Sequence, residues 1–143
     1  MRLSDVIPAV LGLLQGNPFF AGVEIIANID DDYNQRLETA LRDKGLALVV
    51  VQAEGTVPNA KAPRVRMDNA VMVSVLENPA KNTTGPHALE AAEKVIETIH
   101  QAAWGSHGLQ NQFTCGTPAY ELGPLDGGLV VYFCNFNIAT VQP

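Results

Sequence analysis

Six side chains in this sequence have the chemistry to act as a nucleophile, a base or a metal ligand. They are Glu77, His87, His100, His107, Cys115 and Cys134. A catalytic site needs such groups to converge, and a cysteine–histidine pair is the simplest combination among them. The three histidines show neither the HExxH nor the CxxC spacing of zinc sites. We therefore predict no metal site and no cofactor.

The surroundings of these residues favour structural roles over catalytic ones. Cys134 lies in an apolar segment and is expected to be a packed thiol, while a disulfide with Cys115 is the alternative. His100 is expected on a helix surface or helix end, and His107 in a surface loop. The sequence also contains no GxSxG elbow and no GxxxxGK[ST] phosphate loop. We therefore predict that the chain is not an enzyme.

Length and composition narrow the function classes further. The 143 residues predict one domain, 1–143, and 47% hydrophobic against 17% charged residues excludes a disordered chain. Nine Lys and Arg against 15 Asp and Glu give a charge of −6, which argues against a general nucleic-acid-binding surface. No apolar run approaches the roughly 20 residues of a membrane span. The first eight residues also lack the apolar core of a secretion signal.

Hydrophobic periodicity predicts the elements that must position these side chains. Helices are expected from Ser4 or Asp5 to Gly16, over 33–44, and over 87–103. Strands are expected over 22–27, 46–53, 65–76, 113–122 (broken near Pro118) and 129–138. The apolar stripe of the third helix comprises Ala88, Leu89, Ala92, Val95, Ile96 and Ile99. The order α-β-α-β-β-α-β-β predicts an α+β fold: a mainly antiparallel sheet with about three helices packed largely on one face.

Charged residues are unevenly distributed along the chain. The acidic run Asp30 to Asp32 is interpreted as a solvated loop or a helix cap, with a surface facing a partner or a DNA channel as the alternative. Lys61, Arg64 and Arg66 form a small basic patch, and no Lys or Arg follows Lys94. Trp104 is expected to pack at the end of the third helix, although tryptophan is also common at interface hot spots.

One stretch of sequence carries a family resemblance. A strand that ends in Glu77-Asn78-Pro79 is followed by a loop containing Asn82 and by an amphipathic helix that begins near Pro86-His87. This pattern, with the chain length, the N-terminal helix and the late apolar strand, resembles the tail terminator (tail-completion) family of long-tailed phages and prophages. The resemblance implies a homo-oligomer, a hexameric ring that caps the tail tube.

The same resemblance implies the partners of such a ring. They are the tail-tube protein and a head-neck connector protein, and DNA passes through the lumen without specific binding. The expected location is the virion tail, and the host cytoplasm during assembly. Lys61, Arg64 and Arg66 are candidate salt-bridge partners of an acidic neighbouring subunit, and Trp104 is a further interface candidate. The alternatives are another head-tail connector or stopper, a small intracellular Cys/His enzyme, and a ligand-binding module.

Overall fold

The computed structural model describes residues 2–102, 112–125 and 127–142. Its helices are α1 (Val6–Gln15), α2 (Tyr33–Asp43) and α3 (Ala88–Ile99), with 3-10 turns at Leu3–Asp5 and Pro18–Phe20. Its strands are β1 (Glu24–Ala27), β2 (Leu46–Thr56), β3 (Arg66–Glu77), β4 (Thr114–Leu122) and β5 (Val130–Val141). Among the described residues, no helix combines the length and the apolar character that crossing a bilayer requires. The predicted order of helices and strands is confirmed.

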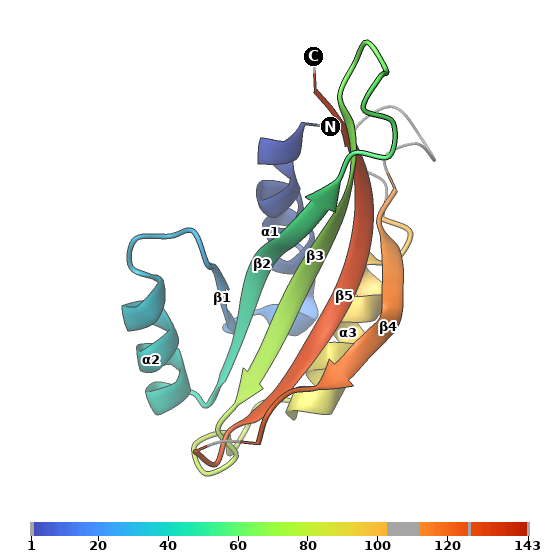
Figure 1. Cartoon of the computed structure of the whole chain (residues 1–143). Helices are drawn as coiled ribbons and strands as arrows, with labels where there is room; N and C mark the ends of the chain where they lie inside the picture. Colours follow the sequence, from blue (N-terminus) through green and yellow to red (C-terminus); the bar gives the residue numbers. More distant parts are fainter. Residues whose placement is uncertain (1, 103–111, 126, 143) are drawn as a thin grey trace.

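All five strands belong to one sheet, in the order β1-β2-β3-β5-β4 (Figure 1). The β1–β2 pair is parallel and the other three pairs are antiparallel. Parallel neighbours need a crossover connection, and α2 supplies it between β1 and β2. The sheet is therefore mainly antiparallel with three helices against it, and the predicted α+β class is confirmed.

The main core lies between one face of the sheet and the helices α1 and α3. Side chains alternate along each strand, so every second residue points to this face. Leu48 and Val50 on β2 meet Val73 and Val75 on β3 in this core, and Phe136 on β5 joins them. The helices contribute the residues Val6, Ile7, Ala9, Val10, Leu14, Ala88, Ala91, Ala92, Val95 and Ile99.

The opposite face of the sheet is covered only in part. Ile26, Ala47 and Val49 point away from the main core but are at most 3% exposed, and α2 contacts both of their strands. Within the described ranges, no helix packs on this opposite face over β3, β5 and β4. The exposed Arg66 and Asp68 and the half-buried Met72 lie there. This part of the sheet is the open face.

The structure corrects two details of the third helix. Helix α3 ends at Ile99, not at residue 103, because the N–H of Gln101 donates to the carbonyl of Phe113 at 2.8 Å. Gln101 accordingly has a φ of 63°, which no α-helix allows. Leu89 was expected in the apolar stripe but is 53% exposed, because the helix turns Ala88, Ala92 and Val95 toward the sheet instead.

Candidate interaction surfaces

The predicted basic patch lies on one projecting hairpin. Residues 56–66, here called the arm, join β2 to β3 and extend beyond the sheet at the end where both termini lie (Figure 1). Every arm residue except Ala62 is exposed. Lys61, Arg64 and Arg66 all belong to the arm, which contains no Asp or Glu. The structure thus brings three of the four predicted interface residues together, while Trp104 lies outside the described residues.

The arm is ordered by its own turn chemistry and by the C-terminal strand. The side-chain Oδ1 of Asn59 accepts a hydrogen bond from the N–H of Lys61 at 3.2 Å. The backbone carbonyl of Asn59 accepts one from the N–H of Ala62 at 3.3 Å. At the base, the carbonyl of Val65 accepts from the N–H of Gln142 at 2.9 Å. Pro58 and Pro63 restrict φ within the loop. These restraints lower the entropy that the arm would lose on binding a partner.

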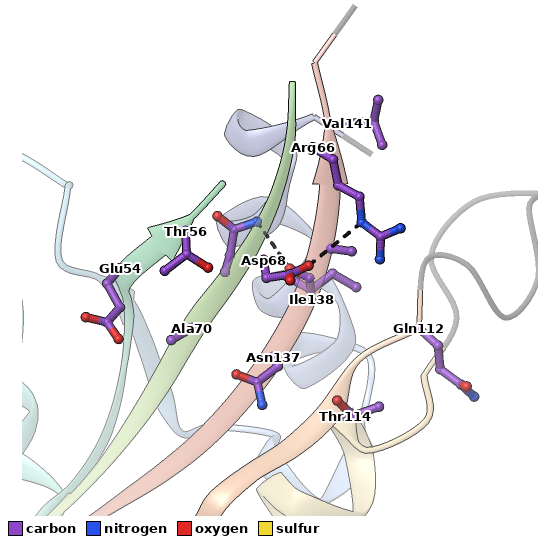
Figure 2. A pocket seen from close by; sticks show the side chains of 12 residues that line it. Glu54, Thr56, Arg66, Asp68, Ala70, Gln112, Thr114, Asn137, Ile138 and Val141 are labelled. Carbon is purple, nitrogen blue, oxygen red and sulfur yellow. Dashed lines mark hydrogen bonds and ion pairs between the residues drawn. The ribbon is translucent and has the colours of Figure 1, made fainter. Parts of the chain in front are cut away.

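A polar hollow of about 720 Å³ lies on the open face at the base of the arm (Figure 2). The Arg66 side chain reaches toward Asp68 there, with Nε 3.9 Å from Oδ1. Asn69 is 2% exposed, and its Nδ2 donates to the hydroxyl of Thr140 at 2.9 Å, while its buried Oδ1 has no partner among the described residues. The described residues that line the hollow include neither a cysteine nor a histidine.

The residues that carry the family resemblance form a buried network at the start of α3. Glu77, at the end of β3, is 4% exposed. Its Oε1 accepts from the N–H of Ala88 at 3.1 Å, and its Oε2 accepts from Asn82 Nδ2 at 2.6 Å and lies 3.0 Å from His87 Nδ1. Asn82 also donates to the carbonyl of Pro86 at 2.8 Å. One carboxylate therefore joins the strand, the loop and the helix.

The electrostatics of this network are those of a helix cap. The amino end of α3 carries unpaired N–H groups and a partial positive charge, which an anion stabilises. Burial raises the pKa of Glu77, but the hydrogen bonds with His87, Ala88 and Asn82 outweigh it, so the pKa lies below its ordinary value. The Glu-Asn-Pro motif therefore has a structural role: it positions α3 on the sheet.

A second surface lies where α3 meets the edge strand β4. Here a hollow of about 300 Å³, called the α3–β4 groove, is lined by Leu89, Ala92, Glu93, Ile96, Glu97 and Tyr120. Leu89 is 53% and Tyr120 50% exposed, although both are large and apolar for most of their surface. Tyr120 pairs with Cys134 across the sheet, so it points to the helix side of β4. The groove is thus lined by apolar side chains of both elements and by two acidic side chains, Glu93 and Glu97, of α3.

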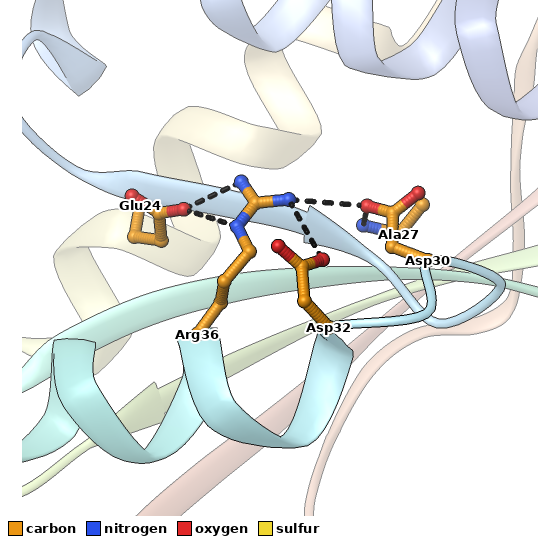
Figure 3. Close-up of polar contacts among 5 residues, drawn as sticks. All are labelled: Glu24, Ala27, Asp30, Asp32 and Arg36. Carbon is orange, nitrogen blue, oxygen red and sulfur yellow. Dashed lines mark hydrogen bonds and ion pairs between the residues drawn. The ribbon is translucent and has the colours of Figure 1, made fainter.

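Two residues of the acidic run Asp30 to Asp32 form ion pairs with a cation of the same chain: Asp30 and Asp32 both lie close to Arg36. The Arg36 guanidinium donates to Glu24 through Nε at 2.8 Å and to Asp30 through Nη1 at 3.2 Å, and it lies 3.9 Å from Asp32 (Figure 3). The hydrogen bond to Glu24 and the charges of the nearby carboxylates raise the pKa of Arg36, and burial lowers it by less, so the pKa lies above its ordinary value. Asp32 occupies the N-cap position of α2 without a side-chain capping bond.

The cysteines and histidines do not form an activated pair in the described structure. His100 and Cys115 are neighbours, but the bond between them runs from the backbone N–H of Cys115 to Nδ1 of His100 at 3.1 Å. Burial raises the pKa of the Cys115 thiol and raises that of Cys134 to about 12, the opposite of what a nucleophile requires. Both cysteines are free. His107 lies outside the described residues.

Metal ligands do not cluster in the part of the chain that the structure describes. No group of three or more His, Cys, Asp or Glu side chains is arranged there to hold an ion.

Comparison with known proteins gives no match, either to a family model or to a curated protein. The candidate sites therefore depend on the geometry of this chain itself.

Sequence reasoning missed the α3–β4 groove. Periodicity predicts Leu89 in the apolar stripe of the third helix and Tyr120 only as part of a strand over 113–122. The alternation of Tyr120, Glu121 and Leu122 at the end of that strand was the available signal. It could not be interpreted, because periodicity does not reveal that β4 is the edge strand.

Proposed function

We propose that this chain is a structural subunit of a phage or prophage tail, of the tail-terminator kind. Copies of it form a closed ring, of six by the family resemblance, that caps the tail tube and offers the docking surface for the head connector. DNA passes through the lumen of the ring without specific binding. Its work is association, without a bond-making step.

The arm is the observation that carries this proposal. A hairpin needs only two to five residues to reverse direction, whereas nine residues, 57–65, separate β2 from β3. Ordering the extra residues costs conformational entropy that almost no burial within the chain offsets, because all but Ala62 are exposed. Three cations on an otherwise acidic chain make the arm a specific contact element. A partner surface supplies the missing burial.

Two further observations support the proposal. The open face leaves side chains of β3 and β5 without a helix over them in the described structure, which provides area for association. The net charge of −6 disfavours retention of DNA in a lumen, because duplex DNA is itself densely negative. The raised thiol pKa values disfavour the Cys/His enzyme alternative.

Capping of growing tail tubes tests the function directly. The purified chain is added to polymerising tail-tube protein of the same virus, and tube lengths are measured by electron microscopy. We expect short tubes of uniform length with a ring at one end. Unchecked elongation in the presence of excess folded chain would overturn the terminator assignment, and a ring that leaves elongation unchanged would favour a connector or stopper.

A double variant, Cys115→Ser with Cys134→Ala, is the matched control for the enzyme alternative. The proposed function needs neither thiol, so the folded variant should cap tubes as the wild-type chain does. Because Cys134 is buried, circular dichroism first verifies that the variant folds. Loss of function in a variant with wild-type spectra would favour thiol chemistry instead.

A further inference from the structure

We propose that the arm of one subunit docks in the α3–β4 groove of the next copy of the chain. This inference rests on the proposed ring function and identifies the two surfaces that would join its subunits. The evidence is the match between the two surfaces in charge and in exposed apolar side chains.

The lining of the groove combines apolar and acidic side chains. Leu89, Ile96 and Tyr120 are the large apolar residues, and Glu93 and Glu97, one turn apart on α3, are the acidic ones. Glu97 lies 3.1 Å from Lys94, whereas Glu93 has no ion pair among the described residues. Two more glutamates, Glu90 and Glu121, are exposed on the same two elements. Lys94 is the only cation on α3 and β4, and of these glutamates only Glu121 points to the open face, away from the groove.

The arm offers the complementary chemistry. Val57 and Val65 are 44% and 47% exposed, and Val65 lies directly between Arg64 and Arg66. Lys61 and Arg64 have no ion pair among the described residues, and Arg66 has only the 3.9 Å contact with Asp68. An apolar hairpin with cations therefore matches an apolar groove with anions. Such complementarity fixes the register of an interface and speeds its formation.

Two other hollows of the described structure fit the arm less well, and a third, of about 530 Å³ beside Leu3 and Ile29, has a single acidic residue, Glu54, in its lining. The hollow beside α2, about 370 Å³, is lined by Arg36 and Lys44 as well as by carboxylates. Its cations would repel those of the arm, and Arg36 already forms ion pairs with Glu24 and Asp30. The hollow on the open face is lined by Arg66, which belongs to the arm itself. The α3–β4 groove is lined by acids and apolar groups without a cation.

The proposed contact also has the symmetry that a ring needs. The arm and the groove are different surfaces of one subunit, so their association is heterologous and passes from each copy to the next. Such a contact closes into a ring when the rotation between copies divides a full turn. A two-fold dimer, by contrast, would join a surface to itself. Arm-in-groove docking is therefore a contact of the type that a cyclic assembly requires.

Charge reversal on each surface tests the docking. The arm variant carries Lys61→Glu with Arg64→Glu, and the groove variant carries Glu93→Lys with Glu97→Lys. Both pairs of residues are exposed, and glutamate and lysine have similar helix propensities, so both variants should fold. A control variant carries Lys81→Glu with Glu38→Lys, which exchanges exposed charges outside both surfaces. Native mass spectrometry and light scattering measure assembly.

We expect each reversal alone to weaken subunit association at least tenfold, while the control variant assembles normally. Mixing the two weakened variants should restore rings. The acidic arm of the arm variant then meets the basic groove of the groove variant, and the basic arm of the groove variant meets the acidic groove of the arm variant. Only rings with an even number of subunits close in this alternating way, so a hexamer should contain three of each. Restoration by mixing also excludes misfolding as the cause of the loss.

Each result has a defined consequence. Wild-type rings that the reversals do not weaken, or variants that stay apart when mixed, would overturn the docking but leave the ring function standing. A wild-type chain that stays monomeric at high concentration and on tail tubes would overturn the ring function and the docking with it. Rings that persist while the arm variant alone loses binding to duplex DNA would assign the arm to nucleic acid and overturn the docking.

Discussion

Replacing Glu77 by Gln removes the buried anion at the start of α3 while keeping the shape of the side chain. The amide oxygen still accepts from the N–H of Ala88, but the new NH2 group faces Asn82 Nδ2, which is also a donor. Loss of a hydrogen bond to a charged group costs about 1.5–3 kcal/mol, and loss of the anion at a helix amino end costs about 1 kcal/mol. We expect Glu77→Gln to lower the free energy of unfolding by about 2–4 kcal/mol.

Urea denaturation and thermal unfolding, followed by circular dichroism, measure this loss. For a domain of this size the melting temperature should fall by about 6–12 °C. Glu90→Gln is the matched control, because Glu90 also lies in the first turn of α3 but is exposed. It should cost only a few tenths of a kcal/mol. Equal losses for the two variants would refute the capping role of Glu77.

The pH dependence gives the same prediction a second readout. The pKa of Glu77 is lower in the folded chain than its ordinary value, so its charge contributes stability above that ordinary value. This contribution disappears as the pH falls through the lowered pKa, where the protonated carboxyl resembles the amide of glutamine. The stability gap between the wild type and Glu77→Gln should therefore narrow on acidification. A gap that is unchanged between neutral pH and pH 3 contradicts the pKa direction.

Three further predictions concern the fold. Gly45→Ala should destabilise the chain by about 2–4 kcal/mol, because φ is +78° and the new Cβ would clash with the backbone N of Asn82. Gly22→Ala, at φ +81° with open space around the new Cβ, should cost about 1 kcal/mol in the same urea titrations. Cys115 should react with iodoacetamide at pH 8 well before Cys134, because Cys134 is fully buried and its pKa is raised to about 12. Peptide mass spectrometry measures the order of modification, and modification of Cys134 first would contradict the prediction. Arg36→Met should lower the free energy of unfolding by less than about 1 kcal/mol, because the side chains of its ion pairs are over one third exposed. High salt should abolish this difference from the wild type. A large loss of stability in chemical denaturation that does not depend on salt would contradict this.

The sequence predicted the elements of this fold well where apolar periodicity coincided with burial. Strand β3 alternates because its odd-numbered residues face α1 and α3, and the polar Asn69 takes one of those positions through bonds to β5. The sequence predicts β2 only to residue 53, whereas the strand continues to Thr56. Glu54 and Thr56 of β2 pair with Ala70 and Asp68 of β3, but Glu54 and Thr56 are exposed. The pattern of hydrophobic residues therefore does not predict this part of the pairing.

The candidate surfaces could be predicted only where they are local in sequence. Lys61, Arg64 and Arg66 lie within six positions of one another, so their shared location on the arm followed from spacing alone. The α3–β4 groove joins Leu89 to Tyr120 across 31 positions. Its existence depends on the strand order, which places β4 at the edge beside α3, and a single sequence does not determine that order.

The acidic residues of this chain divide according to whether the fold itself uses them. Glu77 caps α3 from within the protein, and Glu24, Asp30 and Asp32 share the guanidinium of Arg36. The glutamates of α3 and β4 have only Lys94 on those elements, so the excess negative charge there is available to a partner. Salt screens exposed charges strongly and buried contacts weakly.

The two groups of acids should therefore respond differently to ionic strength. If the arm docks among the exposed glutamates, rising salt should dissociate rings at concentrations that leave the circular dichroism of the subunit unchanged. The comparison needs only light scattering and circular dichroism on one salt series. Rings that grow stronger with salt would instead mean that burial of Leu89 and Tyr120 dominates the interface, since salt does not screen apolar contacts and strengthens them when its ions are excluded from the surface. In that case truncation of Leu89 to Ala would weaken the ring more than any charge reversal.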